Sequence, residues 1–410
     1  MKTIGIIAEY NPFHNGHKYL IDSCKKALDA DNVVVLMSGD FVQRGTPSFV
    51  EKYAKAQMAL CNGADIVFEL PVYYSTGSAE FFASGAVRTL DRLGCIDYLC
   101  FGSETDDTSL LSDIAEILVK EPTDYKKTLS SSLKKGNSFA KARQEALLEH
   151  FSAHKTKFTK TDIIKAISSP NNILGIEYIK ALKKAKSSII PFSVKRIGQD
   201  YSSENFSEFS SATAIRSFIS QNGISKGLDI TMPSNCINLL EENQDKSYIC
   251  QKFSDMMHYK LLMEKEKGFT SFLDVSEDLS NKICSNLEKY KDFDSFCGLL
   301  KSKDLTYSRI SRSLVHIFLD ITASNMEEYV KDDYTSFAKV LGMKKDSSVL
   351  LKEIQKNDKI AVLTNLKKAP SVCNKLEMRL LNETLRSSEI YGCLNAYGTV
   401  NEYRLKQIIL

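Results

Sequence analysis

Two histidines flank a glycine in the H-x-G-H segment from His14 to His17, and their types and spacing could do chemistry. The chain contains 6 His and 19 Gly in 410 residues, so such a cluster is rare by composition. Gly16 would let the backbone approach a ligand, and free N–H groups at a helix start attract phosphate oxygens. As donors, the two imidazoles would stabilise charge on a phosphoryl group as its bond to pyrophosphate breaks.

Other roles are open to the two histidines, which could cap a helix, pack against it or bind a metal. We predict no metal site, because the sequence supplies no third ligand at a suitable spacing. It contains no H-E-x-x-H segment and no cluster of cysteine and histidine.

A second group of polar residues could also bind an anion. Ser211 and Thr213 stand where a helix is expected to begin, and Arg216 follows one turn later. Hydroxyls at a helix N-terminus together with an arginine suit a triphosphate.

Both groups must be positioned by the elements around them, and the first hundred residues alternate between apolar strands and helical segments. Strands are predicted at residues 3–10, 32–39, 64–72 and 96–104, with a fifth at 188–198. Strand–helix repeats with short links predict a doubly wound, Rossmann-like α/β domain with a parallel sheet. Such a sheet binds ligands beyond the carboxyl ends of its strands, which is where the histidine segment would lie.

The rest of the chain is predicted to be helical. Residues 105–168 are Lys-rich with Ser-rich joints and predict a helical insertion within a domain that spans 1–221. Residues 222–410 show helical periodicity and little strand signal, which predicts an all-α C-terminal domain. Residues 121–200 carry 16 Lys/Arg against 7 Asp/Glu, a basic excess that suits a polyanionic partner.

Composition argues against a membrane protein or a disulfide-rich protein. Hydrophobic residues make up 43% of the chain, but no apolar run approaches the roughly 18 residues of a membrane span. The apolar stretch within the first residues, MKTIGIIAEY, is too short for a signal peptide. The 10 cysteines form no C-x-x-C pair, so we expect reduced thiols in a cytoplasmic protein without a membrane partner.

The two polar groups together resemble the HxGH nucleotidylyltransferase superfamily, and longer strings narrow the resemblance. The sequence is similar over nearly its whole length to the bacterial tRNA(Met) cytidine acetate ligase family. The strings that carry this likeness are EYNPFHNGH, MSGDFVQRG, FELP, FGSE, PNNILGIEY and SRISRSLVHIFL.

The resemblance implies an enzyme that activates acetate with ATP as acetyl-adenylate. The acetyl group then passes to N4 of the wobble cytidine of elongator tRNA(Met), which gives N4-acetylcytidine. The implied partners are ATP as co-substrate, acetate and this tRNA, but no DNA. Mg²⁺ on the ATP is possible, although no carboxylate cluster in the sequence marks a site for it.

The resemblance also implies roles for individual residues. The catalytic residues would be His14, His17 and Arg216. Ala212 departs from the superfamily, many members of which have serine there, while Ser211 and Thr213 keep their hydroxyls. The implied ATP-binding residues are Ile7, Ala8, Glu9, Tyr10, Asn11, Pro12, Phe13, His14, Asn15, Gly16, His17, Lys18, Tyr19, Leu20, Gly102, Asn172, Arg196, Ile197, Ser211 and Thr213.

Arginines outside this set are candidates for binding tRNA. Arg44 lies on a glycine-bounded loop and could bind the acetate carboxylate, a phosphate or the tRNA backbone, so its ligand stays open. Arg309, Arg312 and His316 fall on one face of a predicted helix, where they could contact phosphates of an anticodon arm. The alternative for that face is ordinary exposure to solvent.

Two other classes of protein compete with the tRNA ligase. A small-molecule nucleotidylyltransferase would join a nucleotide to a phosphorylated metabolite, but the basic insertion and the long C-terminal segment would then be surplus. A non-catalytic RNA-binding protein would not need His14, His17, Thr213 and Arg216 together. The sequence leaves open which tRNA bases are read, which acyl chains are accepted, whether a metal is required and how the chain oligomerises.

Overall fold

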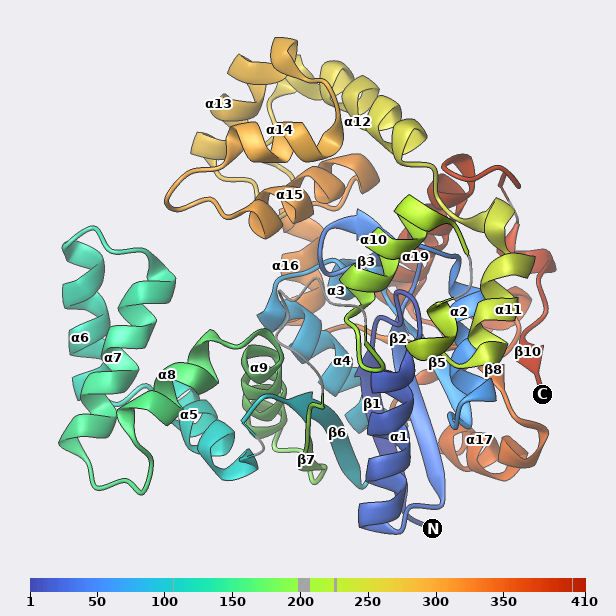
Figure 1. The fold of residues 1–410 in the computed structure, drawn as a ribbon, viewed down its shortest axis with the longest axis horizontal. Coiled ribbons are helices and arrows are strands. Elements are labelled where there is room, and N and C mark those ends of the chain that lie inside the picture. Colours follow the sequence, from blue (N-terminus) through green and yellow to red (C-terminus); the bar gives the residue numbers. More distant parts are fainter. Residues whose placement is uncertain (106, 198–206, 225–226, 400) are drawn as a thin grey trace.

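One eight-stranded sheet organises the part of the chain that the structure, a computed structural model, describes, namely residues 1–105, 107–197, 207–224, 227–399 and 401–410 (Figure 1). Its strands are β1 (Thr3–Ala8), β2 (Asn32–Ser38), β5 (Ile66–Leu70), β6 (Tyr98–Ser103), β7 (Ile190–Lys195), β8 (Phe337–Met343), β9 (Ala361–Leu363) and β10 (Ile408–Ile409). Their order is β10-β8-β5-β2-β1-β6-β7, with β9 paired to β8.

The centre of the sheet confirms the predicted doubly wound α/β fold. Strands β5, β2, β1, β6 and β7 run parallel to one another. The strand order changes direction at β1, because β2 lies on one side of it and β6 on the other. A crevice beyond the carboxyl end of β1 is the expected ligand site of such a sheet. The predicted fifth strand forms as β7, although its last predicted residue, Gly198, lies outside the described residues.

Helices cover both faces of the sheet and bury two apolar cores. One face carries α4 (Ala79–Leu93), α5 (Thr108–Lys120) and α9 (Pro170–Ala185), and the other carries α1 (Asn15–Leu28), α2 (Lys52–Cys61), α10 (Ala212–Asn222) and α11 (Ser234–Glu242). Strand β2 shows why both faces are covered, since alternate side chains of a strand point to opposite faces. Val34 and Leu36 join the first core, and Val33, Val35 and Met37 join the second.

The predicted insertion is helical and extends from one edge of the molecule. Helices α6 (Thr123–Lys134) and α7 (Phe139–Ala153) form its outer part in Figure 1, and α8 (Lys160–Ser168) leads back to α9. Above it lies a helical lobe of α12 (Cys250–Glu264), α13 (Glu277–Asn286), α14 (Phe293–Leu300), α15 (Tyr307–Leu319) and α16 (Ala323–Lys331). Shorter elements and the C-terminal helices complete the chain, namely β3 (Phe41–Val42), β4 (Thr46–Pro47), α3 (Val72–Ser75), α17 (Ser348–Gln355), α18 (Ala369–Val372) and α19 (Lys375–Cys393).

The expectation that residues 222–410 are helical throughout was wrong at three strands. Strand β8 pairs antiparallel with β5, and β9 and β10 pair with β8, so the chain returns to the main sheet after the helical lobe. The signal was hidden because Lys339 and Gly342 interrupt the apolar run of β8. In the fold Lys339 is buried and forms ion pairs with Glu69 and Glu402.

Within the described residues, no helix is both long enough and apolar enough to cross a membrane.

Candidate functional site

The link between β1 and α1 positions the two histidines as a pair. His14 is the N-cap of α1, and its Nδ1 accepts a hydrogen bond from the N–H of Gly16 at 3.1 Å. The Nδ1 of His17 accepts in turn from the N–H of His14 at 3.3 Å, and the two rings stack with their centroids 3.8 Å apart. Since each Nδ1 is an acceptor, a neutral ring carries its proton on Nε2. Both rings therefore have an Nε2–H left to donate to a ligand.

The surroundings keep these imidazoles neutral. Burial lowers the pKa of His14 to about 3, with the charges of Arg196 and Arg216 adding to the effect. Burial also lowers the pKa of His17 well below its ordinary value, with His14 and Arg196 contributing. A neutral pair of donors beside two guanidinium groups can bind an anion without an imidazolium.

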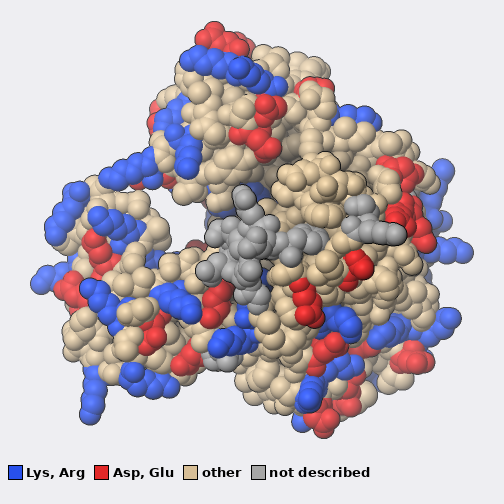
Figure 2. Space-filling view, in the orientation of Figure 1, with Lys and Arg blue, Asp and Glu red and all other residues tan. Residues whose placement is uncertain are grey.

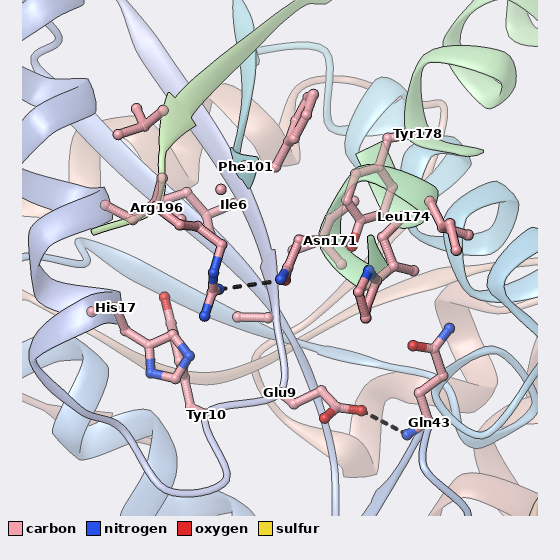
Figure 3. A pocket seen from close by; sticks show the side chains of 18 of the residues that line it. Ile6, Glu9, Tyr10, His17, Gln43, Phe101, Asn171, Leu174, Tyr178 and Arg196 are labelled. Atoms are coloured by element: carbon pink, nitrogen blue, oxygen red, sulfur yellow. Dashed lines mark hydrogen bonds between the residues drawn. The ribbon is translucent and has the colours of Figure 1, made fainter. Parts of the chain in front are cut away.

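The histidine pair opens into a cavity of about 460 Å³ at the carboxyl edge of the sheet (Figure 3). The ends of β1, β6 and β7 and the starts of α1 and α9 supply its walls. Gly102 lies at the end of β6, where an added Cβ would be 3.2 Å from Cγ of Arg196. The Nη1 of Arg196 donates to Oδ1 of Asn171 at 3.4 Å, which directs the guanidinium across the cavity.

The cavity brings together many of the residues singled out from the sequence. Those that line it are Ile7, Ala8, Glu9, Tyr10, His14, Gly16, His17, Tyr19, Leu20, Arg44, Gly102, Arg196, Ile197 and Arg312. It adds an apolar wall of Phe101, Leu174 and Tyr178, which the sequence analysis did not single out. These three lie in the quoted strings FGSE and PNNILGIEY, so the segments were identified but the side chains facing the cavity were not.

Other sequence candidates lie outside the cavity wall. Asn172 is fully buried, and its Oδ1 accepts from Oγ of Ser103 at 2.7 Å and from the N–H of Glu104 at 2.9 Å. Its Nδ2 has no partner among the described residues, and Asn171 takes the place on the wall. Asn11, Pro12, Phe13, Asn15, Lys18 and Arg309 are also not among the lining residues.

The polar residues at the start of α10 lie next to the histidine loop and outside the cavity. Ser211 caps the helix by accepting from the N–H of Ala214 at 3.2 Å. Arg216 donates through Nη1 to the carbonyl oxygen of Asn11 at 2.6 Å and through Nη2 to Oγ1 of Thr213 at 3.3 Å. None of the three capping or bridging residues, Ser211, Thr213 and Arg216, lines the cavity. Arg216 holds the loop that carries His14, and Thr213 accepts a hydrogen bond from the same guanidinium.

A turn between β3 and β4 meets α15 at the opposite wall of the cavity. Gly45 has a φ of +77°, and an added Cβ there would lie 2.3 Å from the backbone nitrogen of Arg312. The Oγ of Ser311 donates to the carbonyl oxygen of Gly45 at 2.6 Å. This docking brings Arg44 and Arg312 to the same cavity. The Nε of Arg312 is buried and has no partner in the described part of the chain, and the residue itself lines the cavity.

The prediction that Arg309, Arg312 and His316 share an exposed face of α15 is correct only in part. Arg309 is exposed, but His316 is fully buried. The two ring nitrogens of His316 contact the carbonyl oxygens of Leu273 at 2.9 Å and Thr76 at 3.0 Å. Residues 313–319 of α15 are buried all round the helix, because α12, α14 and the β3–β4 turn pack against it. His316 therefore joins α15 to neighbouring loops and offers nothing to RNA.

Two further groups near the cavity are relevant to the chemistry. Glu9 directly follows β1, and its Oε1 accepts from the N–H of Gln43 at 2.7 Å. Below it, the Nζ of Lys55 donates to the carbonyl oxygens of Glu9, Ser38 and Gly39 at 3.1, 3.0 and 2.8 Å. Burial lowers the pKa of Lys55 to about 8. This lysine joins the β1–α1 link to the β2–β3 link.

A possible metal-ligand set lies on the insertion, outside the cavity. Asp124, His150 and His154 place their ligand atoms within 4.8 Å of one another, and no other such group occurs in the described residues. Nδ1 of His150 is 2.5 Å from Oδ2 of Asp124, and Nδ1 of His154 contacts the carbonyl oxygen of His150. Hydrogen bonds that join α6 to α7 account for this arrangement without an ion.

The fold and the histidine pair define an α/β protein with an anion-binding loop at the carboxyl edge of its sheet, the architecture of a nucleotidyl-transferring enzyme. The model of the HIGH Nucleotidyl Transferase family matches residues 1–407, and the chain belongs to this family.

Individual relatives of this chain carry more specific names than the family does. The chain is 41% identical over 403 residues to tRNA(Met) cytidine acetate ligase of Clostridium kluyveri, which covers 95% of this chain and 98% of that protein. It is 37% identical to the protein of the same name from Clostridium perfringens over the full length of both. Among solved structures, Thermotoga maritima TmcAL bound with alpha-thio ATP matches with a TM-score of 0.92 and 29% identity over all of both chains.

Proposed function

We infer that this chain is an ATP-dependent ligase that joins acetate to a cytidine of tRNA(Met). One observation carries the inference. The buried, neutral histidine pair opens into a cavity large enough for a nucleotide, in a chain matched over its full length by tRNA(Met) cytidine acetate ligases. A solved relative with the same fold is bound to an ATP analogue, which supports ATP as the activating substrate.

The first step is the activation of acetate. A carboxylate oxygen of acetate attacks the α-phosphorus of ATP, the bond to the bridging oxygen breaks, and pyrophosphate leaves with the electron pair. The Nε2–H donors of His14 and His17 and the guanidinium of Arg196 would contact the phosphoryl oxygens as their charge increases. The apolar wall of Phe101, Leu174 and Tyr178 would receive the adenine or ribose face.

The second step is acetyl transfer to the base. An anticodon loop is already single-stranded, so presenting the base to the adenylate requires little unpairing. We place the acceptor at N4 of the wobble cytidine of elongator tRNA(Met), which gives N4-acetylcytidine and AMP.

The tRNA would lie across the insertion and the helical lobe. Figure 2 shows Lys and Arg spread over both regions, with a notch between them. Asn171 of α9, the helix that follows the insertion, and Arg312 of α15 in the lobe both line the cavity. We propose that the residues up to 221 bind ATP and acetate, while the insertion and the helices of the lobe contact the tRNA. The cytoplasmic location predicted from the sequence suits such a substrate.

Incubation with ATP, ¹⁴C-acetate and bulk bacterial tRNA, followed by nucleoside analysis of the RNA, tests the proposal. Label in N4-acetylcytidine is the expected result. Pyrophosphate release with no label in the RNA would point instead to transfer of a nucleotide to a small molecule. If neither product forms, the proposed function is wrong.

A further inference from the structure

Acetyl transfer to cytosine needs a proton acceptor as well as an activated acetyl group. When the N4 lone pair attacks the acetyl carbon, the C–O bond to the phosphate breaks and AMP leaves with the electron pair. The new N–C bond places positive charge on N4 until one of its protons departs. A group in the cavity that accepts this proton would lower the barrier to transfer.

Among the described lining residues, Glu9 is the only carboxylate. The other polar groups there are poor proton acceptors. Arg44, Lys195, Arg196 and Arg312 are cationic, and the Nδ1 atoms of the two histidines are already occupied by backbone N–H groups. Burial raises the pKa of the Tyr10 hydroxyl and that of Tyr178, so both phenols stay protonated and cannot act as bases near neutral pH.

Contacts with the described residues hold Glu9 in place through only one of its two carboxylate oxygens. Its Oε1 accepts from the N–H of Gln43 at 2.7 Å, and its main-chain oxygen accepts from Nζ of Lys55 at 3.1 Å (Figure 3). Oε2 accepts no hydrogen bond from the described residues, and Glu9 is among the residues that line the cavity. A carboxylate repels the phosphates of ATP, so this oxygen suits the acceptor better than the nucleotide.

Donors that line the same cavity suit the other polar atoms on the edge of cytosine. The Watson–Crick edge of cytosine presents one donor, N4–H, followed by two acceptors, N3 and O2. Glu9 supplies an acceptor, while Ser308 and Arg312 line the same cavity with donors, and Nε of Arg312 is unpartnered in the described structure. Uracil would place its O4 carbonyl against the carboxylate, so the pattern favours cytosine.

We propose that Glu9 receives the N4 amine of the target cytosine and takes its proton during acetyl transfer. The proposal rests on the proposed function and adds a catalytic residue for its second step. It gives Glu9 a role distinct from that of the histidine pair, which serves the first step.

The test compares the two steps in the full-length protein. Acetate-dependent ATP–pyrophosphate exchange reports adenylate formation, and transfer of ¹⁴C-acetate to a tRNA(Met) transcript reports the second step. Glu9→Gln keeps an acceptor for the N–H of Gln43 but removes the base. We expect transfer to fall about 10²–10⁴-fold, the usual contribution of a general base, and at least ten times more than exchange falls. Glu9→Asp retains a carboxylate and should restore part of the transfer.

Each other outcome has a defined meaning. If Glu9→Gln lowers exchange as much as transfer, Glu9 serves the nucleotide and the proposal is overturned while the ligase function stands. Transfer at the wild-type rate would also overturn it. A loss of tRNA affinity equal to the loss of transfer, measured by filter binding, would make Glu9 a binding residue only. If the wild-type protein shows neither acetate-dependent exchange nor transfer, the proposed function itself fails.

Discussion

The two walls of the cavity are built in different ways. On the phosphate-binding wall, the histidine pair is arranged within one short link, in which backbone N–H groups of His14 and Gly16 donate to the two rings. The opposite wall joins the β3–β4 turn to α15, and Ser311 and Gly45, which are bonded there, are 266 residues apart in sequence. The arrangement of the histidine pair is therefore specified locally, while the opposite wall forms only when distant parts of the chain have come together.

This difference suggests that the two walls serve different steps of the reaction. The local wall would carry the activation of acetate. The distant wall would adapt the same chemistry to one acceptor. Glu9 connects the two, because its Oε1 accepts from the N–H of Gln43 in the β3–β4 turn.

The largest effect is expected from the local wall. His17→Ala removes one donor to the developing phosphoryl charge, so acetate-dependent ATP–pyrophosphate exchange should fall about 10²–10³-fold. Filter binding of tRNA should change little, because the ring lies inside the cavity. His258→Ala, which removes a histidine that stacks on Tyr290 outside the cavity, is the matched control for the exchange assay. A comparable loss of tRNA binding in His17→Ala would indicate a structural role.

A change at Gly45 should act on the distant wall. An Ala there is strained at a φ of +77° and would place its Cβ 2.3 Å from the nitrogen of Arg312, which forces the turn away from α15. Gly136 has a φ of +76° and nothing within 4 Å of an added Cβ, so Gly136→Ala carries the backbone strain alone. We expect Gly45→Ala to lower the free energy of unfolding by about 1–3 kcal/mol more than Gly136→Ala does.

The same variant should weaken acetyl transfer to tRNA more than pyrophosphate exchange. Chemical denaturation measures the stability difference, and the two activity assays measure the split between steps. If the two alanine variants were equally stable, separating the turn from α15 would cost no free energy of unfolding. That result would contradict the claim that the turn packs tightly against α15.

Substitutions at Arg309 and Arg312 should have different effects, although both residues were predicted from the sequence to bind tRNA. Arg309→Ala, on the exposed surface, should reduce the salt dependence of tRNA binding by about one unit of slope and leave exchange close to the wild-type rate. Lys26→Ala, at the end of α1 remote from the histidines, is the control. Arg312→Ala should reduce transfer as well, since Arg312 lines the cavity. If Arg309→Ala leaves the salt slope unchanged, α15 does not contact the RNA backbone.

The smallest effect concerns pH. Because burial lowers the pKa of His14 to about 3, from an ordinary value near 6.5, the ring stays neutral at every pH above about 4. Its Nε2–H is then present throughout, and kcat/KM for ATP in the exchange assay should show no histidine inflection between pH 5 and 8. An inflection near 6.5 that disappears in His14→Asn would contradict the neutral donor.

The same contrast between local and distant contacts explains what could be predicted from the sequence. The histidine loop, the parallel strands and the helical insertion follow from short-range patterns, and all three were expected correctly. Strand β8 was missed because the charge of Lys339 is compensated only by Glu69 and Glu402, which come from other parts of the chain.

Individual side chains were harder to place than segments. The string PNNILGIEY was identified, but Asn171 lines the cavity while Asn172 is buried beside Ser103. His316 follows the helical spacing of Arg309 and Arg312, yet α15 is buried on nearly all sides at that level. Helical periodicity fixes which residues share a face, whereas the neighbouring elements decide whether that face meets water.

The measurement that tests the central claim most directly is ATP–pyrophosphate exchange with acetate, with a phosphate ester, or with neither. The account predicts exchange that depends on acetate and is lost in His17→Ala. Exchange that depends on the phosphate ester and ignores acetate would contradict it and indicate a small-molecule nucleotidylyltransferase.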